Sequence, residues 1–127
     1  MKILLVKTSS LGDVVHNLPV ASDIRARFPQ ACIDWVVEEG FADIPRLHPA
    51  VGRVIPVAVR RWRRAPLSAA TWRELRAYRE AVRAEPYDLV LDTQGLIKSA
   101  LLARQAQGKR AGYAAEAARE PLAARFY

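Results

Sequence analysis

The stretch Lys2-Ile-Leu-Leu-Val-Lys7, followed at once by Thr8-Ser-Ser-Leu-Gly-Asp13, decides the fold class of this 127-residue chain. Its first half is a short, nearly continuous apolar run, typical of a strand that is buried on both faces of a parallel sheet. Its second half is a small polar turn, and apolar residues at helical spacing after it predict a helix that reaches about Phe28. Pro19 lies inside that helix, so we expect a kink there.

The same alternation of strands and helices continues along the chain. The patterns predict strands at residues 32–37, 53–57, 87–92 and 109–113, and helices at residues 71–85 and 95–105. In the first of these helices Thr71 and Glu74 have the spacing of a capping box. Its apolar face is predicted to consist of Trp72, Leu75, Tyr78 and Val82. Alternating elements imply right-handed crossovers, so the predicted fold class is α/β, a Rossmann-like parallel sheet flanked by helices.

The composition excludes several classes of protein. With 51% hydrophobic and 26% charged residues the chain is typical of a globular protein rather than a disordered one. The longest aliphatic run, Ile3 to Val6, is far shorter than the ~20 residues of a membrane span, and no signal peptide is recognisable. The single Cys32 excludes an internal disulfide, and one cysteine with two histidines argues against a zinc site. The apolar end at Tyr127 suggests a fragment, and residues 1–127 are expected to form one domain.

The turn after the first strand is the first candidate site, because ligands of an open parallel sheet bind outside the carboxyl ends of its strands. Gly12 allows the backbone to approach a ligand closely. The turn has neither the three glycines of a dinucleotide-binding fingerprint nor the ending of a phosphate-binding P-loop. Asp13 is then either a first-turn helix cap or a general base held at the ligand edge.

A second candidate is Arg60-Arg-Trp-Arg-Arg64, expected as a basic loop after the third strand. Four neighbouring guanidinium groups repel one another, and their planar forks suit phosphate or carboxylate groups. The segment is either a solvated basic loop or an anion site, and an exposed Trp62 would favour binding. Nucleic acid could use the same patch, but the basic residues gather in one loop rather than along a stripe.

The third candidate follows the fourth strand, in Asp92-Thr-Gln-Gly-Leu-Ile-Lys98. Lys98 is predicted in the first turn of a helix, where a cation opposes the helix dipole. It is either a surface lysine or the partner of a ligand or of an acid such as Asp13 or Glu39. Glu38 and Glu39, after the second strand, are expected to be counterions of the arginines.

These loops resemble those of a known family, the lipopolysaccharide heptosyltransferases. The motifs are Val6-Lys-Thr-Ser-Ser-Leu-Gly-Asp13, Asp34-Trp-Val-Val-Glu-Glu-Gly-Phe41, Val54-Ile-Pro-Val57 with Arg60-Arg-Trp-Arg63, Asp92-Thr-Gln-Gly-Leu-Ile-Lys-Ser99 and Ala118-Arg-Glu-Pro-Leu122. They keep the family's order and spacing over essentially the whole chain. The resemblance implies a GT-B glycosyltransferase, of which residues 1–127 are the N-terminal acceptor-binding domain. The C-terminal donor-binding domain would be absent, so we expect no useful turnover from this chain alone.

The resemblance also implies roles for individual residues. Asp13 would deprotonate the acceptor hydroxyl of Kdo in Kdo2-lipid A, which then displaces ADP from ADP-L-glycero-β-D-manno-heptose with inversion, without a metal or another cofactor. The acceptor-binding residues would be Ser9, Ser10, Gly12, Arg60, Arg61, Arg63, Arg64, Lys98 and Arg119.

The net charge of +7 suits a cytoplasmic protein that adsorbs peripherally to the anionic inner face of the inner membrane, where this acceptor is embedded. Binding of nucleic acid is not expected.

Two alternatives stay open at this point. One is a non-enzymatic phosphate- or nucleic-acid-binding α/β module. The other is a complete small nucleotide-binding protein, although the missing glycine fingerprint argues against it.

Overall fold

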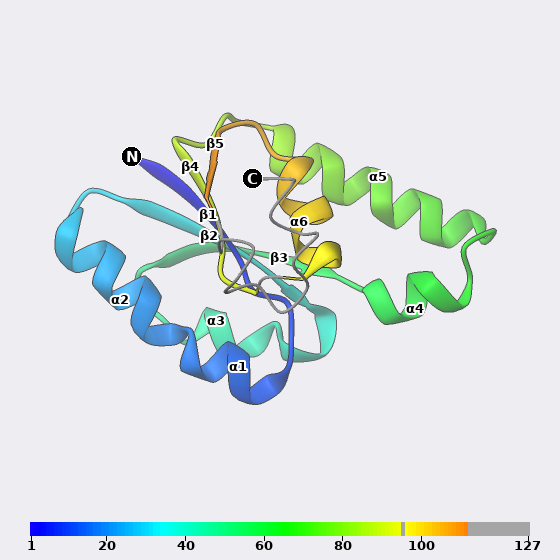
Figure 1. Cartoon of the computed structure of the whole chain (residues 1–127), viewed down its shortest axis with the longest axis horizontal. Helices are drawn as coiled ribbons and strands as arrows, with labels where there is room; N and C mark the ends of the chain where they lie inside the picture. The colour runs from blue at the N-terminus through cyan, green and yellow to red at the C-terminus, as the bar shows by residue number, and fades with distance from the viewer. Residues whose placement is uncertain (95, 112–127) are drawn as a thin grey trace.

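The computed structural model describes residues 1–94 and 96–111, and these form an α/β fold around one parallel sheet (Figure 1). The described strands are β1 Lys2–Val6, β2 Cys32–Glu38, β3 Val51–Val57, β4 Leu89–Asp92 and β5 Lys109–Ala111. They lie in the order β3-β2-β1-β4-β5, and all neighbouring pairs are parallel. The predicted fold class, a Rossmann-like parallel sheet flanked by helices, is therefore confirmed.

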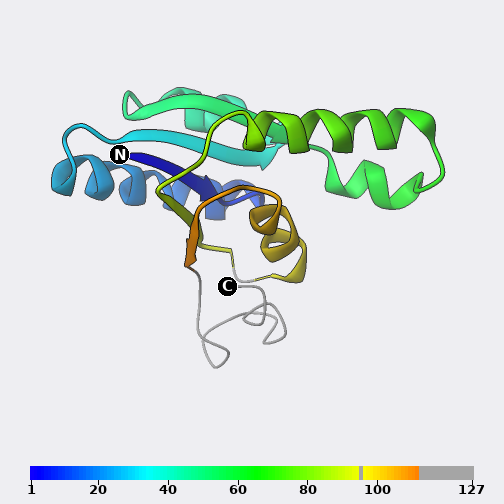
Figure 2. The same cartoon turned by 90° about the horizontal axis from the view of Figure 1, so that it is seen from above.

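Helices cover both faces of the sheet, which explains why the central strand β1 is apolar without interruption from Ile3 to Val6 (Figure 2). The helices are α1 Leu11–His16, α2 Leu18–Arg27, the 3₁₀ turn η1 Glu39–Phe41, α3 Asp43–Arg46, α4 Val59–Arg64, α5 Ala69–Arg83 and α6 Ile97–Arg104. Alternate residues of β1 point to opposite faces, so Leu4 and Val6 pack with α4, α5 and α6, whereas Leu5 packs with α1, α2 and α3.

The predicted kink at Pro19 is a complete break between two helices. Asn17 follows α1 and is also the residue that precedes α2, in which Pro19 is one of the first two residues. A proline is tolerated there because the first N–H groups of a helix have no acceptor within that helix. The sequence therefore located the irregularity correctly, while the structure separates the two segments.

The start of α5 differs from the predicted capping box. Ser68 is the N-cap, and its side chain accepts a hydrogen bond of 3.2 Å from the backbone N–H of Ala70. Thr71 is buried instead, and its hydroxyl donates to the carbonyl oxygen of Ala65 at 2.8 Å. Trp72, predicted on the buried face, is 58% exposed. Leu75, Tyr78 and Val82 do pack into the core as predicted.

A polar network closes the amino edge of the sheet. Asp34 is buried in β2, and its carboxylate accepts a hydrogen bond of 2.6 Å from the hydroxyl of Tyr87. Arg53 in β3 donates to the same carboxylate oxygen at 3.3 Å and to Tyr87 at 3.1 Å. Burial and the hydrogen bond to Asp34 raise the pKa of Tyr87 above its ordinary value. This network joins strands at the edge opposite the candidate site, so its role is structural.

Candidate functional site

The parallel register brings the loops after β1, β2 and β4 to one edge of the sheet. Val6 pairs with Val36 of β2 and with Asp92 of β4. Beyond the strands, the backbone N–H of Glu38 donates to Thr8 at 3.0 Å, and that of Thr93 donates to Val6 at 3.2 Å. Two of the three candidate segments predicted from the sequence, those after β1 and β4, therefore meet at the carboxyl edge, together with the loop after β2.

Asp13 lies at this edge, in the first turn of α1, and is half-buried. Its carboxylate accepts hydrogen bonds from the backbone N–H and the hydroxyl of Ser10, at 3.4 and 3.3 Å. The helix-capping alternative is thus realised in the structure. A cap of this kind does not exclude a base, because the carboxylate remains at the ligand edge of the sheet. Gly12 is exposed, and a Cβ placed there would meet no atom within 4 Å, so the backbone is open to a ligand.

Gln94 holds the first loop in place and was not assigned a role from the sequence. Its side chain is 1% exposed, and its Oε1 accepts hydrogen bonds from the backbone N–H and the hydroxyl of Thr8, at 2.7 and 2.6 Å. Its Nε2 donates to the hydroxyl of Ser9 at 3.3 Å. Asp92 in turn accepts from the backbone N–H of Gln94 at 2.8 Å. The only sequence signal was its place in a polar turn after a buried strand.

Lys98 reaches the first loop from α6. Its Nζ lies 3.2 Å from the hydroxyl oxygen of Ser9. The helix that carries it is fastened to the sheet, because the hydroxyl of Ser99 donates to the buried carboxylate of Asp92 at 2.9 Å. One charged side chain of the third loop therefore meets the serine of the first loop. This is the convergence that the sequence predicted for the strand ends.

The arginine segment is a helix, α4, and not the loop that we predicted. The carboxylate of Glu38, the last residue of β2, accepts hydrogen bonds from the first two backbone N–H groups of this helix. The backbone nitrogen of Val59 lies 3.2 Å from Oε2 of Glu38, and that of Arg60 lies 3.3 Å from Oε1. An acidic group at a helix N-terminus satisfies free donors and complements the helix dipole. Glu38 is therefore a helix cap rather than a counterion of the arginine side chains.

The second correction concerns Trp62, which is only 8% exposed. Its indole N–H donates to the carboxylate of Glu74 in α5 at 2.9 Å. Arg61 also binds Glu74, at 2.8 Å, and it binds Glu39 at 3.1 Å, which confirms the counterion role expected of Glu39. Hydrogen bonds from Arg61 and then Trp62 lower the pKa of Glu74 below its ordinary value. Arg61 and Trp62 thus attach α4 to its neighbours.

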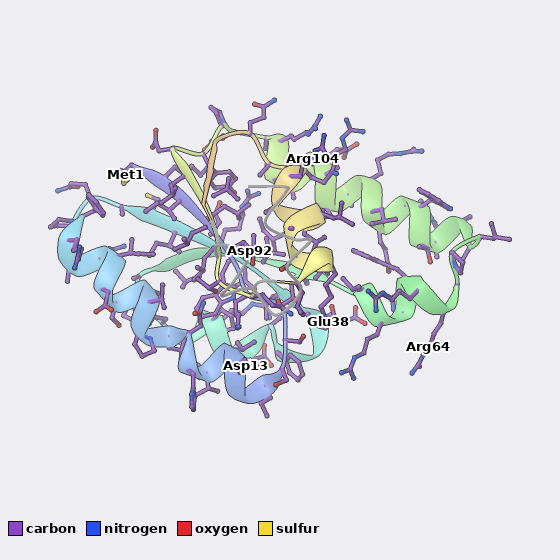
Figure 3. All side chains as sticks on the ribbon, viewed as in Figure 1. Met1, Asp13, Glu38, Arg64, Asp92 and Arg104 are labelled. Atoms are coloured by element: carbon purple, nitrogen blue, oxygen red, sulfur yellow. The ribbon has the colours of Figure 1, made fainter. Side chains whose placement is uncertain are left out.

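The remaining arginines of α4 face solvent. Arg60, Arg63 and Arg64 are exposed, and within residues 1–94 and 96–111 no ion pair involves them. Figure 3 shows Arg64 at the far end of α4, away from Asp13. Arg119, the last predicted acceptor-binding residue, lies outside the described residues.

The described part of the chain contains no group of three or more His, Cys, Asp or Glu side chains that could hold a metal ion. None of the described helices is both long enough and apolar enough to cross a membrane.

Comparisons with known proteins show what this chain is similar to. Residues 75–127 match the family model of glycosyltransferase family 9 (heptosyltransferase). Lipopolysaccharide heptosyltransferase 1 of Escherichia coli K12 is 56% identical over 128 residues, covering all of this chain and 40% of the relative. Lipopolysaccharide heptosyltransferase 1 of Pseudomonas aeruginosa is 54% identical over 129 residues, covering all of the chain and 36% of that relative.

The solved structures of E. coli heptosyltransferase WaaC agree with these matches. Those with ADP and with ADP-2-deoxy-2-fluoro heptose each superpose with a TM-score of 0.96 at 55% identity, covering 100% of this chain. This chain covers 40% and 41% of those two solved chains. It therefore spans about two fifths of the length of the relatives it matches. The resemblance to the heptosyltransferases that the loop motifs suggested is confirmed, and the two curated relatives are both heptosyltransferase 1 proteins.

Proposed function

This chain is a relative of the family 9 heptosyltransferases, and from that premise we infer that it forms the acceptor-binding half of a heptosyltransferase I. The complete enzyme would transfer L-glycero-D-manno-heptose from ADP-heptose to Kdo of Kdo2-lipid A. Residues 1–127 would be its N-terminal domain, and a second domain would bind most of the donor. The observation that carries the proposal is the half-buried carboxylate of Asp13 at the carboxyl edge, oriented by Ser10.

The proposed chemistry is a single displacement. As the Kdo hydroxyl attacks the anomeric carbon of the heptose, its proton passes to the Asp13 carboxylate. The bond between that carbon and the ADP oxygen breaks, ADP leaves with the bonding electrons, and the anomeric configuration inverts. The hydrogen bonds from Ser10 restrict the carboxylate to one orientation, which a positioned base requires. We expect no catalytic metal and no further cofactor.

The acceptor would be bound through its negative charges. The exposed guanidinium groups of Arg60, Arg63 and Arg64 suit the Kdo carboxylates and the lipid A phosphates. Arg61 already binds two carboxylates, so its part is to hold α4 in place. Ser9, Ser10, Gly12, Lys98 and Arg119 complete the proposed acceptor-binding set. The relatives do not favour the alternative of a nucleic-acid-binding module.

We also propose where the enzyme works. A net charge of +7 would draw the protein to the anionic cytoplasmic face of the inner membrane, where the acceptor lies. The attachment would be peripheral, and it would weaken as the salt concentration rises.

Asp13→Asn tests the role of the base, in the longer protein that joins this sequence to a donor-binding domain. The amide keeps the shape of the side chain but cannot accept the proton, so kcat should fall by a factor of about 10² to 10⁴. Binding of ADP-heptose, measured by calorimetry, should not change. Asp23→Asn, on the exposed surface of α2, is the matched control and should keep full activity. A kcat within threefold of the unmodified enzyme would remove Asp13 from the role of base.

A further inference from the structure

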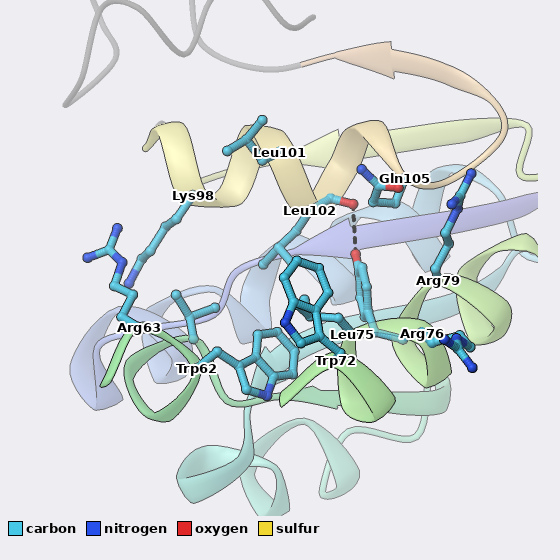
Figure 4. A pocket seen from close by; sticks show the side chains of 12 residues that line it. Trp62, Arg63, Trp72, Leu75, Arg76, Arg79, Lys98, Leu101, Leu102 and Gln105 are labelled. Atoms are coloured by element: carbon cyan, nitrogen blue, oxygen red, sulfur yellow. Dashed lines mark hydrogen bonds between the residues drawn. The ribbon is translucent and has the colours of Figure 1, made fainter. Parts of the chain in front are cut away.

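An apolar groove that no proposed step uses lies between α4, α5 and α6 (Figure 4). Its volume is about 540 Å³, within the range of ~300–1000 Å³ that is usual for sites of small ligands. The apolar lining comes from Val59, Trp62, Trp72, Leu75, Leu101 and Leu102. Two of these side chains are far more exposed than core residues are, since Trp72 is 58% and Leu101 45% exposed. The groove is therefore an open apolar surface and not a packing defect of the core.

The charged side chains around the groove are all cationic. Arg63, Arg76, Arg79 and Lys98 line it, and no Asp or Glu does so among the residues described. None of the three arginines forms an ion pair with the described part of the chain. An apolar floor beside cations matches a ligand that has a hydrocarbon part and a negatively charged head group.

The groove is continuous with the candidate site. Lys98 lines the groove, and its Nζ lies 3.2 Å from the hydroxyl oxygen of Ser9 in the loop that carries Asp13. Arg63 lines the groove from α4, the helix of the proposed acceptor arginines. In Figure 4 the side chains of Arg63 and Lys98 lie together at one end of the groove, with Leu101 and Leu102 further along α6. A ligand whose head group is at the carboxyl edge could therefore extend its chain along α6.

We propose that this groove binds an acyl chain of the anionic lipid acceptor, with a phosphate of the same molecule on the cations of its rim. The proposal rests on the function proposed above and adds a subsite to it. Charge decides between the possible occupants. A second copy of this chain would bring four cations against four cations, which is repulsive, whereas an anionic lipid matches both the floor and the rim.

The first test is a titration with alkyl phosphates below the concentration at which they form micelles. The intrinsic fluorescence of Trp62 and Trp72, which line the groove, reports binding. Octyl phosphate should bind and inorganic phosphate should bind far more weakly. Decyl phosphate should bind roughly tenfold more tightly than octyl phosphate, since each buried methylene adds about 0.8 kcal/mol. Equal affinities for the two chain lengths would overturn the proposal.

Two variants locate the binding. Leu101→Ser places a hydroxyl in the groove at a position that is 45% exposed, so the fold should tolerate it, and the affinity for decyl phosphate should fall about fivefold or more. Leu47→Ser, at a residue that is 77% exposed on the other side of the sheet, is the matched control and should bind normally. An unchanged affinity in Leu101→Ser would refute the assignment. Binding that this chain shows and the longer protein lacks would also refute the assignment, because the rest of the longer protein would then cover the groove.

The last measurement separates this inference from the proposed function. The longer protein is assayed with the acylated acceptor and with the same acceptor after removal of its acyl chains. We expect a lower KM for the acylated form, and a ratio of the two KM values that moves toward one in Leu101→Ser. Equal KM values in the unmodified enzyme would refute the acyl-chain subsite while the transferase function stands. Absence of transfer to either acceptor would refute the transferase function, and the alkyl phosphate titration would still decide what the groove binds.

Discussion

Replacing Gln94 by Met should destabilise the candidate site, although the sequence pattern assigned this residue no role. The substitution keeps the length of the side chain and leaves no large cavity, so it isolates the amide group. Thr8 would lose the acceptor of both its backbone N–H and its hydroxyl, at 2.7 and 2.6 Å. Both groups are buried, since Thr8 is 1% exposed, so water could not replace the amide easily. Each unsatisfied donor costs about 1–3 kcal/mol, so the two donors together give a loss of roughly 2–6 kcal/mol in the free energy of unfolding.

Urea denaturation followed by circular dichroism measures this loss. The transition midpoint should fall while its slope stays unchanged, because the surface exposed on unfolding is nearly the same. Gln107→Met, at an exposed position beyond α6, is the matched control and should change the stability by less than ~0.5 kcal/mol. A loss below ~0.5 kcal/mol in Gln94→Met would refute the reasoning.

A double-mutant cycle shows whether the loss passes through Thr8. Thr8→Val removes a buried hydrogen bond in the unmodified protein and should cost about 1 kcal/mol. In the Gln94→Met background the same change replaces an orphaned hydroxyl by a methyl group, so it should be neutral or stabilising. The coupling energy should therefore be about 1–2 kcal/mol, and strict additivity of the two losses would show that the hydroxyl and the amide do not interact.

Three further predictions follow from other contacts. Tyr87→Phe removes the hydroxyl that donates to the buried carboxylate of β2, and thermal or urea unfolding should show a loss of about 1–3 kcal/mol; an unchanged stability would contradict the structural role of that network. The hydrogen bond from Arg61 lowers the pKa of Glu74 below its ordinary 4.5, so its contribution is present above pH 4.5 and is lost as the pH falls through the lowered pKa. The stability difference between the unmodified protein and Glu74→Gln should thus shrink with acidification below pH 4.5, and a constant difference would refute this linkage. Reversing the charges of Arg60 and Arg63 to Glu should raise the acceptor KM of the longer protein at least tenfold with little change in kcat, and an unchanged KM would reduce them to solvated side chains.

The strands and the position of the site were accessible from the sequence because local physics determines them. A continuous apolar run is stable as a strand only where both faces are covered, so the residues after Lys2 predicted a central parallel strand. Parallel strands bring their carboxyl ends to one edge. The sequence could therefore place Asp13 and Lys98, which follow β1 and β4, at the same edge of the sheet before any contact between them was known. Pro19 located the break between α1 and α2 because a missing N–H acts on its own helix.

The details that govern the site depended on partners far away in the chain. The arginine segment became a helix because the carboxylate of Glu38, 21 positions before Val59, satisfies its first N–H groups. Trp62 became buried because Glu74 from another helix accepts its N–H. Gln94 acquired its role only once β4 lay beside β1 and brought its amide to a loop 86 positions earlier. A sequence pattern records the preference of each segment for its own conformation, whereas hydrogen bonds and packing between segments exist only after the chain has folded.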